Sequence, residues 1–542
     1  MQPTHLPADR RARHTASGDW PRPSLSTLLA ARARDAADRP FVIEGRRDGD
    51  RTCTFADVAR RADRMAVALE RLGIGHDDPV VWQLPNWMEG AALAAAIDRV
   101  GAISVPALTI WRERELAFAC RQTGARALVV PGLVRGTDHR ELARAVAGDV
   151  LDLAHVLTVR AEPAPGQHAL EALEDDPGVP LAPSPHGPHD VAAVFYTSGT
   201  TADPKGVMHT PSTLGAFVGC HARLLHPTQD DCGLLQFPIG HIGGVGLYIL
   251  LPAWHGSRAV YMEQFDPELA VEMIARHGVT VAGGPPAVLQ GLLGAPNATP
   301  ERLASVRLSG TGAADVSPEL VRRLRAGFPP TAVVYRSYGL TECPMVTCGD
   351  PADTLAGLEG FDGRAVPGAA VRVVDEQGAP LPPGAEGEVE VFGPQLCVGY
   401  VDPALNEAFQ PDGFFRTGDL GVMDADGRLR ITGRRKDVII RKGENLSAKG
   451  IEDELAAHPA VAEVAVIGVP DAASGERVCA CVVLRAGASL RLDDVRGFMR
   501  DRGVMAQKIP EQLEVVDALP RNAVGKVRKD VLRARFGGRG RV

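Results

Sequence analysis

The segment Tyr196–Gly206, with the sequence YTSGTTADPKG, constrains this chain more than any other stretch. The apolar run before it, Val191–Phe195, predicts a buried strand that ends in a loop. Consecutive hydroxyl groups, backbone N–H groups made accessible by glycine, and one lysine suit a loop that holds a polyphosphate. The spacing is not that of a Walker A loop, which requires Gly-x4-Gly-Lys-Ser/Thr. Because loops of this composition are also common surface turns, the segment alone leaves both interpretations open.

Strand and helix patterns alternate along residues 41–130, which predicts a mainly parallel sheet with helices on both faces. Residues 1–50 begin with an irregular lead-in, and residues 161–189, rich in Pro, Ala, Gly and acidic residues, indicate a surface linker. The patterns predict strands at Phe41–Ile43, Pro79–Leu84, Ala102–Val105 and Ala127–Val130, and helices at Ser24–Ala37, from Thr54 onward, at Asn86–Val100 and at Arg112–Thr123.

Four later strands are each followed by a turn that contains glycine. They are predicted at Gly233–Phe237, Val279–Ala282, Val306–Ser309 and Val333-Val334. Ligands of α/β sheets bind at one set of strand ends, so we expect these turns to surround a binding site. From residue 370 the pattern changes to short β runs, which predict a small antiparallel sheet or partial barrel. A charged, hinge-like stretch at 433–437 separates it from a compact α+β unit over 437–542.

Composition excludes several classes of protein. The net charge of −8 argues against a nucleic-acid binder. No apolar run is long enough to span a bilayer, and neither end carries a recognisable targeting signal, so we expect a cytoplasmic protein. The nine cysteines are scattered without a Cys-x2-Cys pair, which predicts reduced, mostly buried thiols rather than disulfides or a zinc site.

Lysine is rare in this chain, because almost every basic residue is arginine. A lysine retained among arginines suggests a position that needs a compact ammonium group. Six of the seven lysines lie after residue 430, which draws attention to the C-terminal unit; they are Lys205, Lys436, Lys442, Lys449, Lys508, Lys526 and Lys529.

Five motifs follow one another over residues 190–530: Tyr196–Gly206, Tyr338–Glu342 (YGLTE), Thr417–Asp419 (TGD), Gly433-Arg434 and Asn522–Lys526. Together they resemble the adenylate-forming superfamily, which includes acyl-CoA synthetases, adenylation domains of peptide synthetases and firefly luciferase. The resemblance implies an α/β fold: a large N-terminal domain, residues 1–435, of two α/β subdomains and a small β-barrel. A hinge would join it to a small mobile α+β C-terminal domain, residues 436–542.

The resemblance implies an acid–thiol ligase reaction. A carboxylate attacks the α-phosphate of ATP to give an acyl-adenylate and pyrophosphate, and the thiol of CoA then displaces AMP to give a thioester. The partners implied are a small carboxylic acid and CoA, with a carrier protein's phosphopantetheine arm as an alternative acceptor, and the cofactors are ATP and Mg²⁺.

Residue roles follow from the same resemblance. Glu342 would hold Mg²⁺, Tyr338 would stack on adenine, and Asp419 would bind the ribose hydroxyls. Thr341 would bond the α-phosphate, and Lys526 would stabilise the charge that develops in the adenylation transition state. The catalytic residues implied are Lys526, Glu342, Thr341 and His241, and the ATP- or CoA-binding residues are Thr197, Ser198, Gly199, Thr200, Thr201, Lys205, Gly312, Ala313, Ala314, Tyr338, Gly339, Asp419, Arg434, Lys436 and Gly443.

Three of these residues are implied to serve the second half-reaction. Lys436 falls at the hinge position, about which the C-terminal domain would swing and withdraw Lys526. Gly443 resembles a glycine beside the pantetheine tunnel, and His241 occupies the position of a gate between adenylate and tunnel.

The acid is expected to be medium-chain, alicyclic or aromatic. Its pocket is predicted among Ile242–Val245, Gly283–Ala287, Gly310–Ala314 and Met345–Thr347, where no charged side chain is available to pair an amino group. Two alternatives stay open: adenylation with transfer to a carrier protein, and a nucleotide-binding protein without turnover. Formation of acyl-adenylate without acyl-CoA would indicate the first, and ATP binding without pyrophosphate release the second.

Overall fold

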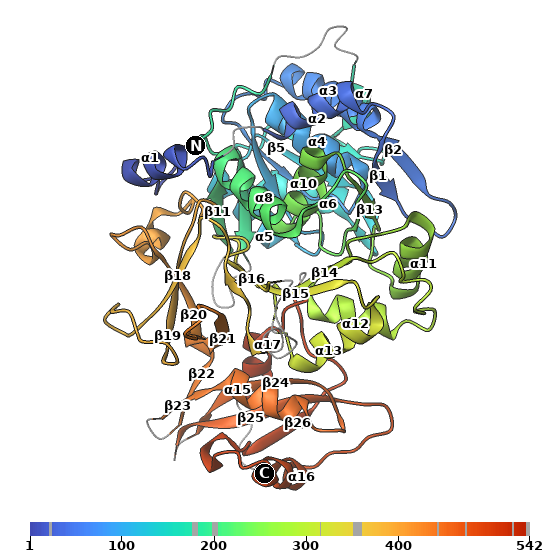
Figure 1. Cartoon of the computed structure of the whole chain (residues 1–542). Helices are drawn as coiled ribbons and strands as arrows, with labels where there is room; N and C mark the ends of the chain where they lie inside the picture. The colour runs from blue at the N-terminus through green and yellow to red at the C-terminus, as the bar shows by residue number, and fades with distance from the viewer. Residues whose placement is uncertain are drawn as a thin grey trace.

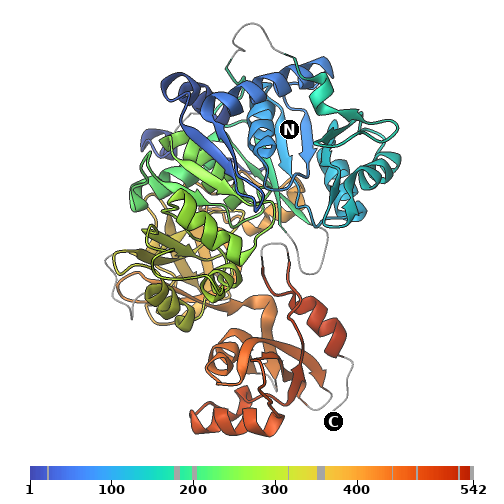
Figure 2. The ribbon, with the colours of Figure 1, turned by 90° about the vertical axis from the view of Figure 1, so that its right-hand side faces the viewer.

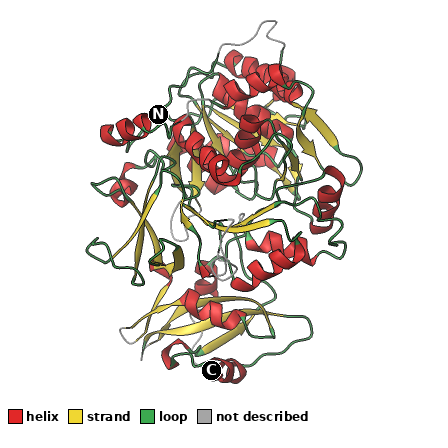
Figure 3. Cartoon of the chain, viewed as in Figure 1, coloured by secondary structure: helices red, strands yellow, loops and turns green. Residues whose placement is uncertain are grey.

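The computed structural model describes residues 1–20, 24–175, 183–197, 204–314, 316–350, 360–441, 444–471, 474–522 and 525–537 of the 542-residue chain. A small C-terminal domain, orange to red in Figures 1 and 2, lies below a much larger N-terminal body. In Figure 3 the helices gather mainly around the upper body, whereas strands run through every part of the chain. This arrangement confirms the predicted fold class.

A seven-stranded sheet forms the first α/β unit, in the order β11-β10-β4-β3-β5-β8-β9. The pairs from β10 through β9 are parallel, and β11 is an antiparallel edge strand. Its strands are β3 (Pro79–Trp82), β4 (Ile103–Pro106), β5 (Ala127–Pro131), β8 (His155–Val159), β9 (His168–Ala169), β10 (Ala193–Thr197) and β11 (Lys205–His209). A small hairpin of β6 (Leu133–Val134) and β7 (Thr137–Asp138) follows β5.

Helices cover both faces of this sheet, as the sequence pattern predicts. Val80 and Trp82 pack with α3 and α4 in one buried cluster, whereas Val81, between them, packs with α5 and α6 in another. This alternation follows from the two-residue period of a strand. The helices are α3 (Phe55–Arg71), α4 (Met88–Arg99), α5 (Glu113–Thr123) and α6 (His139–Asp149).

A second sheet has the order β12-β13-β1-β2 and continues through single bridges, Gly233 to Val281 and Val281 to Leu308, into β14-β15-β16-β17. The predicted strand Val279–Ala282 is therefore present only as this bridging residue. The strands are β1 (Pro40–Glu44), β2 (Arg51–Thr54), β12 (Cys232–Leu234), β13 (Arg258–Tyr261), β14 (Leu308–Thr311), β15 (Val333–Tyr338), β16 (Thr347–Cys348) and β17 (Arg364–Ala365). The helices around it are α2 (Leu25–Asp35), α8 (Pro211–Leu225), α9 (Ile242–Val245), η1 (Gly246–Leu250), α10 (Leu251–His255), α11 (Pro267–His277), α12 (Pro286–Gly294) and α13 (Pro318–Gly327).

Two segments differ from the sequence prediction. The irregular lead-in contains helix α1 (Ala8–Ala16), which is anchored because buried Arg10 donates to the carbonyls of Leu396 and Cys397. The helix has almost no apolar stripe, so periodicity gives no sign of it. The predicted linker 161–189 contains β9 and the short helix α7 (Leu170–Leu173), which buries Leu170.

An antiparallel sheet follows, as predicted, with β18 (Ala370–Val374), β19 (Glu386–Phe392), β20 (Phe415–Met423) and β21 (Leu429–Arg434). The short helix η2 (Pro403–Ala408) precedes β20, and η3 (Arg435–Asp437) joins β21 to the C-terminal domain. A boundary at residue 436 thus falls within a connector, and its exact position remains a prediction. All nine cysteines are buried and free, as predicted, and no helix in the described part of the chain is long and apolar enough to cross a membrane.

The C-terminal domain is a five-stranded sheet with helices. Its strands are β22 (Val438–Arg441), β23 (Glu444–Ser447), β24 (Val461–Asp471), β25 (Gly475–Leu484) and β26 (Gln512–Val515). The helices are α15 (Ala448–Ala456), α16 (Leu492–Asp501), η4 (Ala506–Lys508) and α17 (Lys529–Phe536). Buried clusters on the two faces of β24 and β25 give this domain a core of its own.

Candidate active site

One cavity of about 730 Å³ lies where strand ends of the N-terminal body, the antiparallel sheet and the C-terminal domain meet. It brings together most of the residues that the motifs single out. Those lining it are Thr197, Lys205, His241, Gly312, Ala313, Tyr338, Gly339, Thr341, Glu342, Asp419, Arg434, Lys436 and Lys526.

The remaining predicted site residues lie elsewhere or outside the described ranges. Ala314 lines a neighbouring cavity of about 340 Å³, together with Ala313, Tyr338 and Lys526. Ser198, Gly199, Thr200, Thr201 and Gly443 fall outside the described residues. Thr197 and Lys205, which flank the first four, pair across β10 and β11, so both ends of the segment are held at the cavity.

Asp419 is the centre of a buried hydrogen-bonded cluster on β20. Its Oδ2 accepts from the hydroxyl of Tyr338 at 2.7 Å, and its Oδ1 lies 2.9 Å from Nε of Arg434, its partner across β20 and β21. Desolvation, and then the charge of Asp419, raise the pKa of Tyr338 well above its usual value. The tyrosine therefore stays protonated, and its hydroxyl donates a hydrogen bond to the carboxylate. This bond and the ion pair with Arg434 hold the three side chains together.

Glu342 is another buried carboxylate that lines the cavity. Its Oε1 accepts from the hydroxyl of Tyr400 at 2.7 Å, and the ammonium of Lys205 lies 5.8 Å from the centre of the Tyr400 ring. Tyr400 thus contacts both a carboxylate and a cation that line the cavity, a combination that fits a hard divalent cation and its phosphate ligands. The sequence pattern did not identify Tyr400, which lies 58 residues from its partner.

The turn that carries Thr341 is held by a buried histidine. Nε2 of His209 lies 2.9 Å from the carbonyl oxygen of Thr341, and Nδ1 lies 3.1 Å from the hydroxyl of Thr213. Desolvation lowers the pKa of His209 to about 4, so the ring is neutral and Nε2 donates to the carbonyl. A side chain at Gly339 would lie 2.4 Å from the amide nitrogen of Met345, which explains the glycine in this turn.

Glycine is also required at the neighbouring strand end. A Cβ atom at Gly312 would lie 2.4 Å from the carbonyl oxygen of Ser337, and Ala313 adopts a positive φ of 63°. The backbones of β14 and β15 therefore meet closely at this edge, and a flat ligand can reach the main chain there.

His241 lies at the other end of the cavity, next to aromatic side chains. Its Nδ1 accepts from the amide of Gly243 at 3.0 Å, and its ring stacks on Phe237 with the planes 9° apart. Desolvation lowers the pKa of His241 to about 4, so the ring is neutral at pH 7. Nδ1 is the acceptor, which leaves the proton on Nε2.

The walls at this end include residues that sequence reasoning missed. Ile242, Gly283, Gly310 and Met345 line the cavity as predicted, whereas Val346 and Thr347 are buried and do not line it. Additional lining comes from Phe217, His221, Phe237, Leu247, Tyr248 and Tyr335. Their only sequence signal is an aromatic or apolar residue at a strand end or on a helix, a pattern that ordinary cores share.

Lys526 comes from the C-terminal domain and reaches into the same cavity. Desolvation, and then the charge of Arg434, lower its pKa to about 7, and Lys436 adds to this effect. Lys436 itself has a lowered pKa, chiefly through desolvation. Two lysines and an arginine at the end of one cavity form a site that favours a polyanion.

The strand ends of a large α/β domain face a small α+β domain across one cationic cavity. This arrangement is typical of a two-domain, nucleotide-dependent ligase. The chain belongs to the AMP-binding enzyme family: residues 29–401 match the family's model, and residues 450–526 match that of the AMP-binding enzyme C-terminal domain. ATP and CoA are the substrates of the acid–thiol ligases in this family, with Mg²⁺, as the motifs predict.

Known relatives cover nearly the whole chain. A salicyl-AMP ligase / salicyl-S-ArCP synthetase of Mycobacterium tuberculosis is 35% identical over 98% of this chain and 94% of its own length. The 2-hydroxy-7-methoxy-5-methyl-1-naphthoate–CoA ligase of Streptomyces carzinostaticus is 34% identical over 98% and 96%. The crystal structure of ATP-bound MatB from Rhodopseudomonas palustris is 31% identical, with a TM-score of 0.84 over 95% of this chain and 99% of that one.

Proposed function

We propose that this protein activates a cyclic carboxylic acid, aromatic or alicyclic, with ATP and transfers the acyl group to CoA. A medium-chain carboxylic acid is the alternative substrate. The observation that carries the proposal is the position of Lys526, which lines one cavity with Glu342 and Asp419 although it belongs to the other domain.

In the first step, a carboxylate oxygen bonds to the α-phosphorus and the bond to pyrophosphate breaks. Lys526 offsets the negative charge that grows on the α-phosphate and the attacking carboxylate, and the amide and hydroxyl of Thr341 bind the α-phosphate. Lys205 and the segment that follows Thr197 hold the departing pyrophosphate. Glu342 would hold Mg²⁺, which when bound offsets phosphate charge.

The nucleoside part is held by the cluster around Asp419. The carboxylate accepts from the ribose hydroxyls through the lone pairs that Tyr338 and Arg434 do not use, since each oxygen can accept two hydrogen bonds. The ring of Tyr338 and the backbone at Gly312 and Ala313 enclose adenine.

In the second step, the sulfur of CoA attacks the acyl carbon and AMP leaves. The neutral ring of His241 lines the cavity beside Phe237 and can move aside without breaking an ion pair. Withdrawal of Lys526 by rotation about Lys436 would clear the path of the thiol, and Gly443 would border that path.

The aromatic lining supports a ring-containing acid. The rings of Tyr335 and Tyr248 lie directly over Gly310 and Gly233, where any side chain would displace them, and both rings line the cavity and can contact a ring of the acid. Asp231 also lines the cavity, but Arg307 neutralises it at 2.5 Å, so it does not offer a free charge to an amino acid. This supports a neutral ring rather than an amino group.

A buried amide supports a polar substituent on that ring. Gln236 is 5% exposed, and neither its oxygen nor its nitrogen has a hydrogen-bond partner. Its Oε1 lies 2.7 Å from where a side chain of Gly284 would begin, and Gly284 lines the cavity. Because an unpaired buried amide is costly, a hydroxyl or carbonyl of the acid would be the partner that it lacks.

Transfer to a carrier protein is the second candidate, since the salicyl-activating relative is named for an S-ArCP product. Mass spectrometry of a reaction with ATP, Mg²⁺, CoA and a panel of aryl, alicyclic, fatty and amino acids distinguishes the candidates. An acyl-CoA that is absent with Lys526→Ala supports the ligase proposal. Acyl-adenylate without acyl-CoA would favour a carrier protein, and ATP binding without either product would contradict both. A cytoplasmic location belongs to the same proposal, and cell fractionation tests it.

A further inference from the structure

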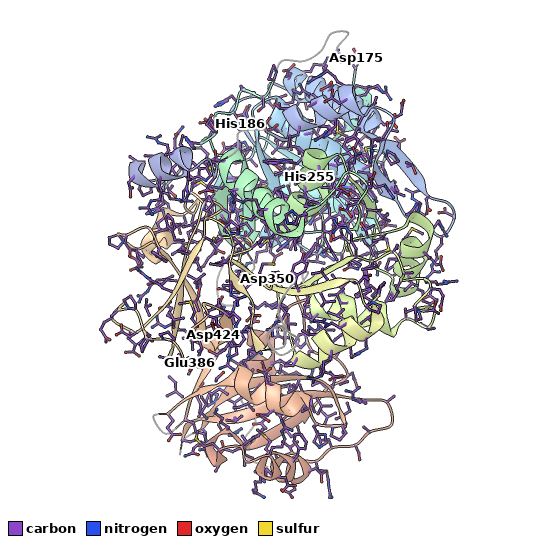
Figure 4. All side chains as sticks on the ribbon, viewed as in Figure 1. Asp175, His186, His255, Asp350, Glu386 and Asp424 are labelled. Carbon is purple, nitrogen blue, oxygen red and sulfur yellow. The ribbon has the colours of Figure 1, made fainter. Side chains whose placement is uncertain are left out.

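His76, His186 and Asp190 meet on the N-terminal body, away from the catalytic cavity. Among the described residues they form the one group whose ring nitrogens and carboxylate oxygen all lie within 4.8 Å of one another. Nε2 of His76 and Oδ2 of Asp190 are 3.9 Å apart, and the two imidazole centres are 5.8 Å apart. Figure 4 labels His186 in the upper part of the molecule, far from the C-terminal domain.

The second nitrogen of each histidine faces an oxygen atom of the protein. Nε2 of His186 lies 3.1 Å from the carbonyl oxygen of Ala102, so it carries the proton and donates. Nδ1 of His76 lies 3.6 Å from Oδ2 of Asp77, whose other oxygen pairs with the α-ammonium of Met1 at 3.0 Å. Metal-ligating histidines characteristically donate one nitrogen to a carbonyl or carboxylate and present the other to the ion.

The other ring nitrogen of His186, Nδ1, carries a lone pair, and no donor in the described part of the chain is available to it. Its Nδ1 is buried and has no hydrogen-bond partner. A buried acceptor without a donor is unfavourable, and the neighbouring side chains of His76 and Asp190 also offer lone pairs. A cation coordinated by all three would satisfy Nδ1 and neutralise Asp190 at the same time.

We propose that His76, His186 and Asp190 bind a divalent transition-metal ion of the Zn²⁺ type. Two imidazoles and one carboxylate suit Zn²⁺, Ni²⁺ or Co²⁺, whereas Mg²⁺ prefers oxygen ligands alone. Bond lengths of about 2.0–2.1 Å in a tetrahedral site place ligand atoms about 3.4 Å apart. The observed 3.9 Å needs only a small movement of His76, whose side chain is 48% exposed. Water would occupy the fourth position.

The ion would join two connections of the fold. His76 lies between α3 and β3, and His186 and Asp190 lie just ahead of β10, which leads into the segment proposed to hold pyrophosphate. The backbones already approach closely, because a side chain at Gly101 would lie 2.4 Å from Pro185 and 3.2 Å from His76. The site is therefore structural: it would fix the approach to β10 without taking part in the reaction.

Titration of the tag-free, chelator-treated protein with Zn²⁺ in a calorimeter tests the proposal. We expect one ion per chain, at least tenfold weaker binding in His76→Ala, and no change in His168→Ala, a matched exposed histidine outside the site. Co²⁺ should give the visible absorption of a tetrahedral site, lost in the same variant. Because His186→Ala removes a buried side chain, Asp190→Asn is the second variant, with circular dichroism to confirm its fold. Equal Zn²⁺ affinity of the parent protein and of both site variants, or absence of binding below millimolar Zn²⁺, would overturn the proposal.

Discussion

The burial of Lys526 gives the sharpest prediction, because the proposed mechanism needs its charge for adenylation although burial makes that charge unfavourable. Its pKa of about 7 means that roughly half of the ligand-free molecules carry the ammonium at pH 7 and about one tenth at pH 8. If only the charged form binds the triphosphate productively, kcat/KM for ATP falls about tenfold per pH unit above pH 7.

The sign of the stability effect follows from the same shift. The unfolded chain holds the Lys526 proton up to its ordinary pKa of 10.5, and the closed arrangement loses it near 7, so stability of that arrangement rises with pH between these values. At about 1.4 kcal/mol per pKa unit, the cost of the charge at pH 7 and below is on the order of 4–5 kcal/mol. The proposed rotation of the C-terminal domain would relieve this cost, so the figure is an upper limit. The negative charge of bound phosphate would remove the cost of the buried ammonium group, so ATP binding would favour the arrangement in which Lys526 enters the cavity.

Lys526→Arg is the informative variant, since a guanidinium stays charged at every pH of the assay. Pyrophosphate release should show a basic limb near pH 7 in kcat/KM for the parent protein, and a lower but flat profile for the variant. In kcat the parent's limb should move to higher pH, because bound phosphate raises the pKa of the lysine. Identical limbs for parent and variant would refute the assignment of this titration to Lys526.

Three further changes should each affect a different part of the molecule. Glu342→Gln should raise at least tenfold the Mg²⁺ concentration that gives half-maximal pyrophosphate release. The amide oxygen of the variant can still accept the hydrogen bond of Tyr400, so the local structure is kept. An unchanged Mg²⁺ titration would contradict the metal role. Gly312→Ala should weaken ATP binding about tenfold or more in calorimetry with little change in acid dependence, because its Cβ would lie 2.4 Å from the carbonyl of Ser337. Arg10→Met should lower the free energy of unfolding in urea by about 2–4 kcal/mol, because two buried carbonyls lose their donor; unaltered stability would show that helix α1 is not anchored by this side chain.

Local signals carried most of the fold prediction. A short apolar run such as Val80, Val81 and Trp82 predicts a strand buried on both faces, and the structure places these side chains alternately in two helical layers. Glycines at strand ends mark places where backbones approach. Helix α1 was not predicted because one buried arginine, rather than an apolar face, anchors it. The strand predicted at 279–282 is reduced to one bridge, since its residues only link β12 to β14.

Residues of the candidate site that stand in a recognised motif could be predicted from the sequence, whereas their hydrogen-bond partners could not. Asp419 and Glu342 stand in recognisable motifs, but their hydrogen-bond donors, Tyr338 and Tyr400, lie 81 and 58 residues away. Those donors also decide what the carboxylates can do. A tyrosine hydroxyl occupies one lone pair and carries no charge, so it holds each carboxylate in position without neutralising it. Arginine donors in both places would have neutralised them. In the proposed mechanism, the carboxylate paired with arginine, at Asp419, would suit an uncharged ribose, and the carboxylate paired with tyrosine, at Glu342, would suit a divalent cation.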